Sequence, residues 1–339
     1  MVKEAFYLIR KSDFPKFIDS LVKKTAFIAP VLKKGEWNYK KIDTARDLNI
    51  TGFTNTEFPP KKFLIPEGHV IAEYDNGKLK KGKDGSDIIL FGMRPCDVHG
   101  ILVLDKVMLS GEFTDDCYNK KRNSITIFAL NCSTAGENCF CDSMETCEVN
   151  EGYDLLFTEQ GNNYHVQVGS PKGKKFISSA LFKKTSSKAK KTRLKFKKKL
   201  NTENLPEIMK ASFESKIWED TSKKCLSCAS CTSICPTCYC FDILHENSEE
   251  KGKGKIVRDS NYCMLKPFTK VAGNVISRKS RTERLKQFFY HKLVYGKENQ
   301  GKYHCVGCGR CITECMTKID ITEEVKKIRN EYAKRKLRS

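Results

Sequence analysis

Two stretches of closely spaced cysteines carry the clearest chemistry in this sequence. Both have the spacing Cys-x2-Cys-x2-Cys-x3-Cys, and the eight residues are Cys225, Cys228, Cys231 and Cys235, then Cys305, Cys308, Cys311 and Cys315. In bacterial ferredoxins with this spacing, three close thiolates hold one [4Fe–4S] cluster and the fourth cysteine ligates the other. The sequence therefore predicts two clusters, one on Cys225, Cys228, Cys231 and Cys315, the other on Cys305, Cys308, Cys311 and Cys235.

Structural zinc is the alternative for these eight cysteines. Zinc sites usually pair two Cys-x2-Cys units about 12–20 residues apart, a pattern that neither quartet follows. The two motifs differ in detail. Ala229 of the first motif stands where glycine is common, and Met316 follows the fourth cysteine of the second motif, where the first motif has Pro236. Neither change removes a ligand. We expect backbone N–H groups to face the sulfurs, and Gly307 and Gly309 suit the tight turns that this requires.

A second, looser group of cysteines lies in the N-terminal half: Cys96, Cys132, Cys139 and Cys141, with Cys147 nearby. Cys96 and Cys132 each follow an apolar run, 86–91 and 124–130, of the kind that forms a strand buried on both faces. Parallel strands would bring both cysteines to the same sheet edge, where α/β proteins place ligands. We therefore consider a third [4Fe–4S] cluster on Cys96, Cys132, Cys139 and Cys141, with zinc or metal-free thiols as alternatives, and leave open whether Cys147 replaces Cys141.

The elements that would position these cysteines can be read from hydrophobic periodicity. Residues 13–22 have one apolar helical face, with Asp13 as N-cap, and 97–109 predicts a helix between the two buried strands. Residues 27–31 with 37–42, and 153–158 with 164–168, predict hairpins. Helices are expected over 201–213 and in the insert 236–304, and 321–339 predicts a basic amphipathic helix or a frayed tail.

These patterns predict a mixed α+β chain. Residues 1–170 would form an α/β domain with parallel strands and hairpins, 171–200 a basic linker or arm, and 201–339 a mainly helical, ferredoxin-like domain with two clusters. Cys238, Cys240 and Cys263 are not absorbed by either motif. They are interpreted as packing thiols or sulfur contacts near a cluster, with an extra ligand or a redox role as the alternative.

Composition agrees with thiolate ligation inside a reducing compartment. The chain has 339 residues, 17 cysteines and a net charge of +21. No apolar run is long enough to span a membrane and no export signal is recognisable, so we expect a cytoplasmic protein rather than a disulfide-linked secreted one. Residues 172–199 carry thirteen of the basic residues and no acid. No Gly-x-Gly-x-x-Gly, phosphate loop or Ser/His/Asp set is found, so no catalytic residue is predicted.

Several segments of the chain, taken in order, resemble one family. They are Arg94-Pro95-Cys96-Asp97, Cys132, Cys139-Phe140-Cys141, the first motif with Cys238 and Cys240, residues 284–292 and the second motif. That family is the iron–sulfur subunit shared by anaerobic sulfite reductases and sulfhydrogenases, which in the sulfhydrogenases is the β subunit. The resemblance covers about residues 10–325. It implies an electron-relay subunit of an anaerobic oxidoreductase, placed between a companion that binds FAD and NAD(P)H and a catalytic subunit with sirohaem or nickel–iron.

Other functions remain alternatives at this stage. The segment 172–199 could bind nucleic acid through its charge, or provide a docking surface for an acidic ferredoxin or partner subunit, or be a solvated loop. A standalone reductase with a flavin at the N-terminal sheet edge is a third interpretation. The relay hypothesis predicts redox chemistry that nucleic acid does not affect.

Overall fold

The computed structural model describes residues 5–82, 86–190 and 192–338, which fall into two compact units. The first unit comprises residues 1–60, 84–136 and 145–196, and the second comprises 61–83, 137–144 and 197–339. Each unit is thus built from three separate stretches of chain. Within the described residues, no helix is both long and apolar enough to cross a membrane.

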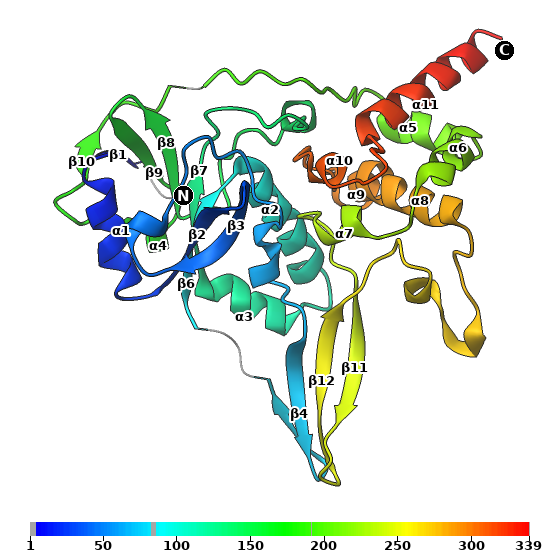
Figure 1. Cartoon of the computed structure of the whole chain (residues 1–339), viewed down its shortest axis with the longest axis horizontal. Coiled ribbons are helices and arrows are strands. Elements are labelled where there is room, and N and C mark those ends of the chain that lie inside the picture. Colours follow the sequence, from blue (N-terminus) through cyan, green and yellow to red (C-terminus); the bar gives the residue numbers. More distant parts are fainter. Residues whose placement is uncertain (1–4, 83–85, 191, 339) are drawn as a thin grey trace. The chain divides into compact units, whose positions relative to one another are not determined.

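An eight-stranded sheet organises the first unit, in the order β10-β1-β9-β8-β7-β6-β2-β3 (Figure 1). The four central strands β8, β7, β6 and β2 pair in parallel, and the outer pairs are antiparallel. Its strands are β1 (Ala5–Arg10), β2 (Ala26–Lys33), β3 (Glu36–Ile42), β6 (Ile88–Met93), β7 (Ile125–Leu130), β8 (Leu155–Gln160), β9 (Asn163–Val168) and β10 (Lys183–Thr185). The α/β class with parallel strands, and both predicted hairpins, are confirmed.

Helices cover this sheet where the sequence supplies apolar faces. The helices of the unit are α1 (Phe14–Val22), α2 (Pro95–Leu109), α3 (Asp116–Ser124), α4 (Pro171–Lys174) and the short η1 (Ala45–Asp47). Four buried side chains of α1 enter a core rich in phenylalanine, which also contains Phe91, Phe128 and Phe157. Asp13 precedes α1 as predicted, but its side chain makes no capping hydrogen bond, since its backbone is already helical.

The basic segment 171–200 was predicted to be a linker or arm. Part of it instead belongs to the folded first unit. It supplies α4, and β10 adds a strand to the sheet beside β1. Ile177 and Phe182 lie in the phenylalanine-rich core. The lysines on either side of this stretch, among them Lys175 and Lys183, are exposed, since a long basic side chain can keep its charged end in water while the neighbouring apolar residues are buried.

The second unit combines a bundle of short helices with a four-stranded antiparallel sheet. The sheet runs β11-β12-β4-β5, from β4 (His69–Asp75), β5 (Lys78–Lys81), β11 (Phe241–Asn247) and β12 (Lys253–Ser260). The β11–β12 hairpin lies in the insert that was expected to be helical, so that expectation was wrong for 241–260. Neither strand has a regular apolar–polar alternation, and both are held by pairing with each other and by the pairing of β12 with β4, which is remote in sequence.

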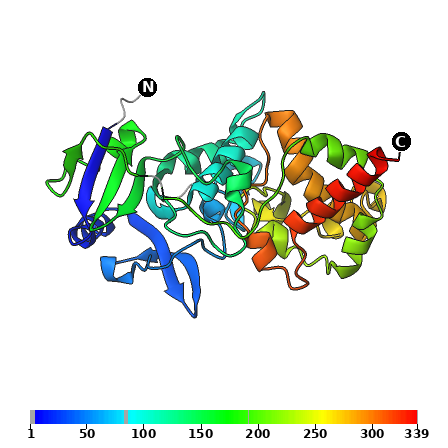
Figure 2. The same ribbon diagram turned by 90° about the horizontal axis from the view of Figure 1, so that it is seen from above.

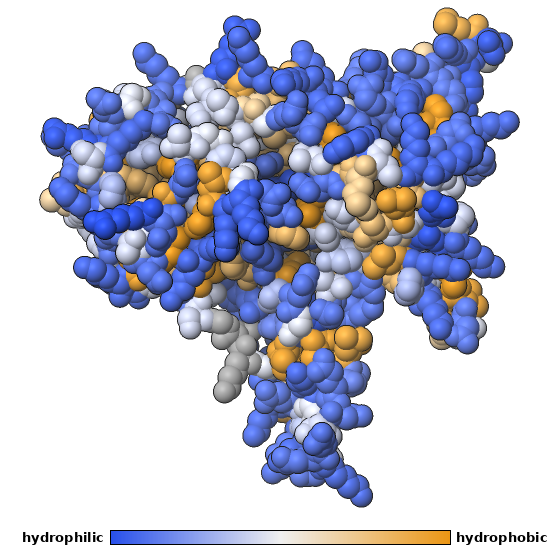
Figure 3. Space-filling model, in the orientation of Figure 1, coloured by the Kyte–Doolittle hydropathy of each residue, from blue (hydrophilic) through white to orange (hydrophobic). Residues whose placement is uncertain are grey.

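The helices of the second unit pack around Trp218, Phe289 and Tyr290, which are at most 1% exposed. Figure 2 shows α11 lying across its neighbours. The longer helices are α5 (Leu205–Ala211), α6 (Ile217–Lys224), α8 (Arg281–Tyr290) and α11 (Ile321–Lys336); the short ones are α7 (Ser230–Ser233), α9 (Gly296–Gln300), α10 (Arg310–Thr313), and η2 (Pro60–Phe63), η3 (Cys141–Met144), η4 (Pro267–Thr269), η5 (Ala272–Asn274) and the π-helical η6 (His291–Tyr295). Hydrophilic side chains cover the far end of the four-stranded sheet (Figure 3).

Candidate iron–sulfur centres

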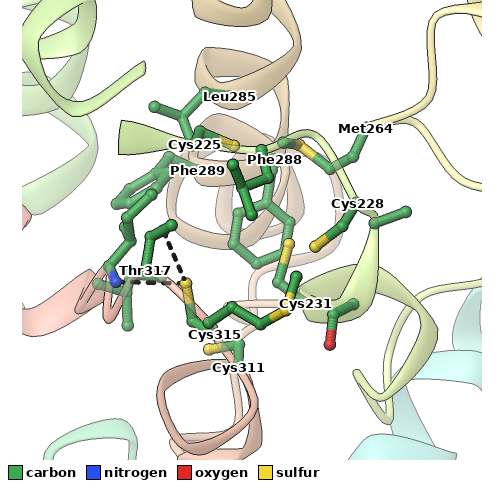
Figure 4. Close-up of a pocket in the computed structure, with 16 residues that line it drawn as sticks. Cys225, Cys228, Cys231, Met264, Leu285, Phe288, Phe289, Cys311, Cys315 and Thr317 are labelled. Carbon is green, nitrogen blue, oxygen red and sulfur yellow. Dashed lines mark hydrogen bonds between the residues drawn. The ribbon is translucent and has the colours of Figure 1, made fainter. Parts of the chain in front are cut away.

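The first predicted quartet converges on one apolar cavity of the second unit. Cys225, Cys228, Cys231 and Cys315 all line this cavity, whose volume is about 50 Å³, and Figure 4 shows their sulfurs gathered there. Met264, Leu285, Phe288 and Phe289 complete the apolar wall. Soft thiolates in a dry, compact pocket are the donor set that an iron–sulfur cluster takes. The residues present therefore fit a cluster at this position.

Local backbone geometry turns N–H groups towards the sulfurs of this quartet. Ser227 and Ala229 adopt left-handed conformations, with φ of 52° and 64°, and α7 starts directly after them. The N–H of Ser227 donates to Cys225 Sγ at 3.4 Å, and the N–H of Ile319 donates to Cys315 Sγ at 3.3 Å. Hydrogen bonds of this kind stabilise negative charge on thiolate sulfur.

The second quartet lines a neighbouring cavity of about 20 Å³. Cys235, Cys305, Cys308 and Cys311 contribute to it, and Cys311 and Phe288 also line the first cavity. Gly307 and Gly309 have φ of 61° and 76°, in the left-handed region that the turn before α10 requires. The interlaced pairing predicted from the spacing is therefore the one that the structure brings together: Cys235 lies with the second motif and Cys315 with the first.

Residues 137–144 pack against the turn of the second motif. The N–H of Phe140 donates to Gly307 O at 2.8 Å, and the Cys139 thiol contacts Cys308 O at 3.5 Å. A Cβ on Gly307 would lie 2.6 Å from the Cα of Cys141. Glycine is thus required here by backbone approach as well as by φ.

Burial favours the protonated form of three of these thiols when nothing ligates them. It raises the pKa of Cys231 and Cys311, and it raises the pKa of Cys305 to about 12. Neighbouring thiols act in the same direction. A cationic metal centre would supply the charge that compensates thiolate at these three positions.

Two lysines that the sequence reasoning did not assign to the site lie beside the second quartet. Lys292 is 2% exposed, and its Nζ donates to Thr237 Oγ1 at 2.7 Å. Burial alone would lower the pKa of Lys292, but the thiols of Cys235 and Cys238 together raise it, so the side chain stays charged. Lys61 Nζ donates to Cys238 O at 2.9 Å. Nothing in the spacing around Lys61 signals this role, because its partner is 177 residues away.

The N-terminal cysteines are divided between the units. Cys96 is buried in the first turn of α2, and Cys132 directly follows β7. Burial raises the pKa of Cys132, while the charges of Arg94 and Asp97 act on it in opposite directions, so Cys132 lies close to the start of α2. The predicted parallel pairing of β6 and β7 is confirmed.

A cavity of about 300 Å³ in the first unit is lined by Cys132 and also by Cys147. Polar side chains, among them His165 and Lys188, share its wall. Cys139 and Cys141 belong to the second unit, where they contact the turn of the second motif. The composition of an N-terminal cluster therefore stays a prediction.

Comparison with known proteins agrees with this arrangement. Residues 224–319 match the family of 4Fe-4S dicluster domains. No solved structure matches the chain. Fold and site together define an iron–sulfur protein with a 4Fe-4S dicluster domain.

The chain is also 30% identical to the sulfhydrogenase 2 subunit beta of Pyrococcus furiosus, over 329 residues that cover 93% of this chain and 96% of the relative. It belongs to the family of that subunit, so it is an iron–sulfur, electron-transfer subunit. The family expected from the motif series is thereby confirmed.

Proposed function

We propose that this chain relays single electrons through two [4Fe–4S] clusters within an anaerobic oxidoreductase complex. The observation that carries the proposal is the convergence of eight cysteines into two interlaced quartets around adjacent apolar cavities. When bound, the clusters would supply reversible one-electron chemistry. The helical part of the second unit would act as an enlarged ferredoxin-like domain.

The chain's own residues would set the conditions for electron transfer. Phe288 and Phe289 exclude water, and the backbone N–H groups of Ser227 and Ile319 stabilise the ligating sulfurs. Lys292 places a buried positive charge beside the second quartet, which favours the reduced, more negative state there. The second site is therefore expected to have the higher reduction potential of the two.

A third [4Fe–4S] cluster is part of the proposal, with Cys96, Cys132, Cys139 and Cys141 as ligands and Cys147 as the alternative to Cys141. The relative's name, sulfhydrogenase, supports a complex that handles hydrogen or sulfur. We propose a flavin- and NAD(P)H-binding subunit on one side of the relay and a catalytic subunit on the other. The exposed lysines of 172–199 would dock an acidic partner.

Electron paramagnetic resonance of single-cysteine variants tests the relay. Cys231→Ser should remove the reduced-cluster signal of the first site, Cys311→Ser should remove that of the second, and Cys117→Ser should remove neither. Loss of both signals in each variant, with the circular dichroism spectrum intact, would contradict two separately ligated clusters. A salt-sensitive gel shift with nucleic acid, or flavin absorbance in the purified chain, would instead favour the alternative functions.

A further inference from the structure

Besides Cys139 and Cys141, three cysteines of the second unit lie outside both quartets, and two of these three lie at the open end of a hairpin. Cys240 directly precedes β11, and Cys263 follows β12. The first pair of the hairpin is Phe241 opposite Ser260, and the next residue, Asn261, donates its N–H to Cys240 O at 3.2 Å. Strand pairing therefore fixes the approach of the two cysteines.

The two side chains lie close enough to interact, because the thiol and the backbone N–H of Cys263 both lower the pKa of the Cys240 thiol. Cys263 is buried, with 8% exposure, whereas Cys240 is partly exposed. One residue of the pair is thus buried and the other is partly accessible, as in a reactive thiol with a resolving partner.

Positive charge surrounds this pair. The neighbouring Cys263 lowers the pKa of Cys240 to about 6, and Lys292 and Lys61 act in the same direction. Thiolate is the reactive form in thiol–disulfide exchange. Lys292 Nζ donates to Thr237 Oγ1 at 2.7 Å, and Thr237 Oγ1 lies 3.2 Å from the sulfur of Cys235 in the second quartet. Hydrogen bonds therefore connect Lys292, which acts on the cysteine pair, to a predicted cluster ligand.

We propose that Cys240 and Cys263 form a redox-active dithiol–disulfide couple that exchanges electrons with the second cluster site. Reduction breaks one S–S bond, takes up two electrons and two protons, and leaves two thiols. The electrons arrive singly at Cys235 from the reduced relay, and the protons come from solvent at Cys240. Oxidation runs in reverse and returns two electrons to the relay. The couple would collect single electrons from the relay and pass them in pairs to a substrate of the disulfide or polysulfide class.

The exchange with the cluster rests on the proposed relay, whereas the couple itself does not. The first experiment therefore addresses the couple alone. The cluster-loaded full chain is equilibrated anaerobically with reduced and oxidised dithiothreitol, alkylated under denaturing conditions and digested for mass spectrometry. We expect one linked peptide pair, Cys240 with Cys263, whose fraction follows a two-electron titration. Complete alkylation of both thiols under oxidising conditions would overturn the proposal.

Variants separate a redox couple from a structural or ligand role. Cys263→Ser and Cys240→Ser should each abolish the linked pair, with iron and sulfide content unchanged. In a reductive titration, each oxidised variant should take up two electrons per chain fewer than the wild type. Cys117→Ser, in the first unit, should retain the pair. Loss of iron in Cys263→Ser, or zinc bound by the wild-type pair, would assign these thiols to a metal instead.

The second experiment tests the connection to the relay. Photoreduction of the oxidised wild-type chain should open the linkage, and the same treatment of Cys311→Ser should leave it closed. Opening in both proteins would keep the couple but contradict the route through the second site. Formation of the linked pair in a chain without any cluster signal would contradict the relay and leave the couple in place.

Discussion

Replacing Gly309 with alanine tests how the second site is built. A Cβ at this position would lie 2.4 Å from the carbonyl oxygen of Asn138 and 2.9 Å from the N of Cys139, both of them backbone atoms. The residue also has φ of 76°. A non-glycine residue in this conformation costs about 1–2 kcal/mol, and overpacking against fixed atoms adds about 1–3 kcal/mol. The expected destabilisation of Gly309→Ala is therefore about 2–5 kcal/mol.

The first motif offers a matched control, because Ala229 occupies the equivalent place with φ of 64°. Ala229→Gly removes strain of about 1–2 kcal/mol. It also loses a buried methyl group worth about 0.8 kcal/mol and adds about 0.5–1 kcal/mol of chain entropy to the unfolded state. These terms nearly cancel, so this variant should unfold much like the wild type.

Urea unfolding, followed by circular dichroism and by the visible absorbance of the clusters, measures both variants. Gly309→Ala should also lose about four iron atoms per chain, because residues 137–144 can no longer pack on the turn that holds Cys308. If Gly309→Ala retains its iron and unfolds within about 0.5 kcal/mol of the wild type, the packing of 137–144 on the second motif is wrong.

Further predictions concern the first unit. Arg94 is buried and donates to four backbone carbonyls, those of Phe53, Thr54, Leu130 and Asn131. Arg94→Met should destabilise the unit by about 3–5 kcal/mol, since these acceptors lose their donors, and Arg94→Lys should recover only part of the loss in thermal unfolding. The hydroxyl of Tyr118 donates to Asp105 at 2.7 Å, and burial raises the pKa of Tyr118 far above its ordinary value of 10.0. Its contribution to stability is complete below pH 10 and declines above it by up to about 1.4 kcal/mol per pH unit, so Tyr118→Phe should flatten the alkaline limb of the stability curve; an equally steep limb in that variant would refute the assignment. Cys132→Ser should lower the iron content by about four atoms per chain if the third cluster forms, and unchanged iron would make Cys132 a plain thiol.

The local elements of the first unit were predictable because their periodicity is contained within single segments. The apolar runs before Cys96 and Cys132 have no polar face, so they had to be central strands, and β6 and β7 are indeed parallel. The strand β10 escaped prediction because it is three residues long and lysine-rich. Its place is fixed only by pairing with β1, far away in sequence.

The two groups of cysteines could be predicted because the spacing within each motif is typical of cluster ligands. The residues around these cysteines could not be predicted in this way. Lys61 and the segment 137–144 reach the second site from distant parts of the chain, and no local pattern marks them. The Cys240–Cys263 contact depends on the register of β11 and β12, a hairpin that the sequence pattern did not reveal.

The most direct measurement of the central claim is iron and acid-labile sulfide per chain in anaerobically purified protein. Two clusters predict about eight of each, and the proposed third cluster raises both to about twelve. Reduction with dithionite should then give interacting signals of reduced [4Fe–4S] clusters in electron paramagnetic resonance. Zinc without sulfide, after reconstitution with iron and sulfide, would contradict the electron-transfer account of this chain.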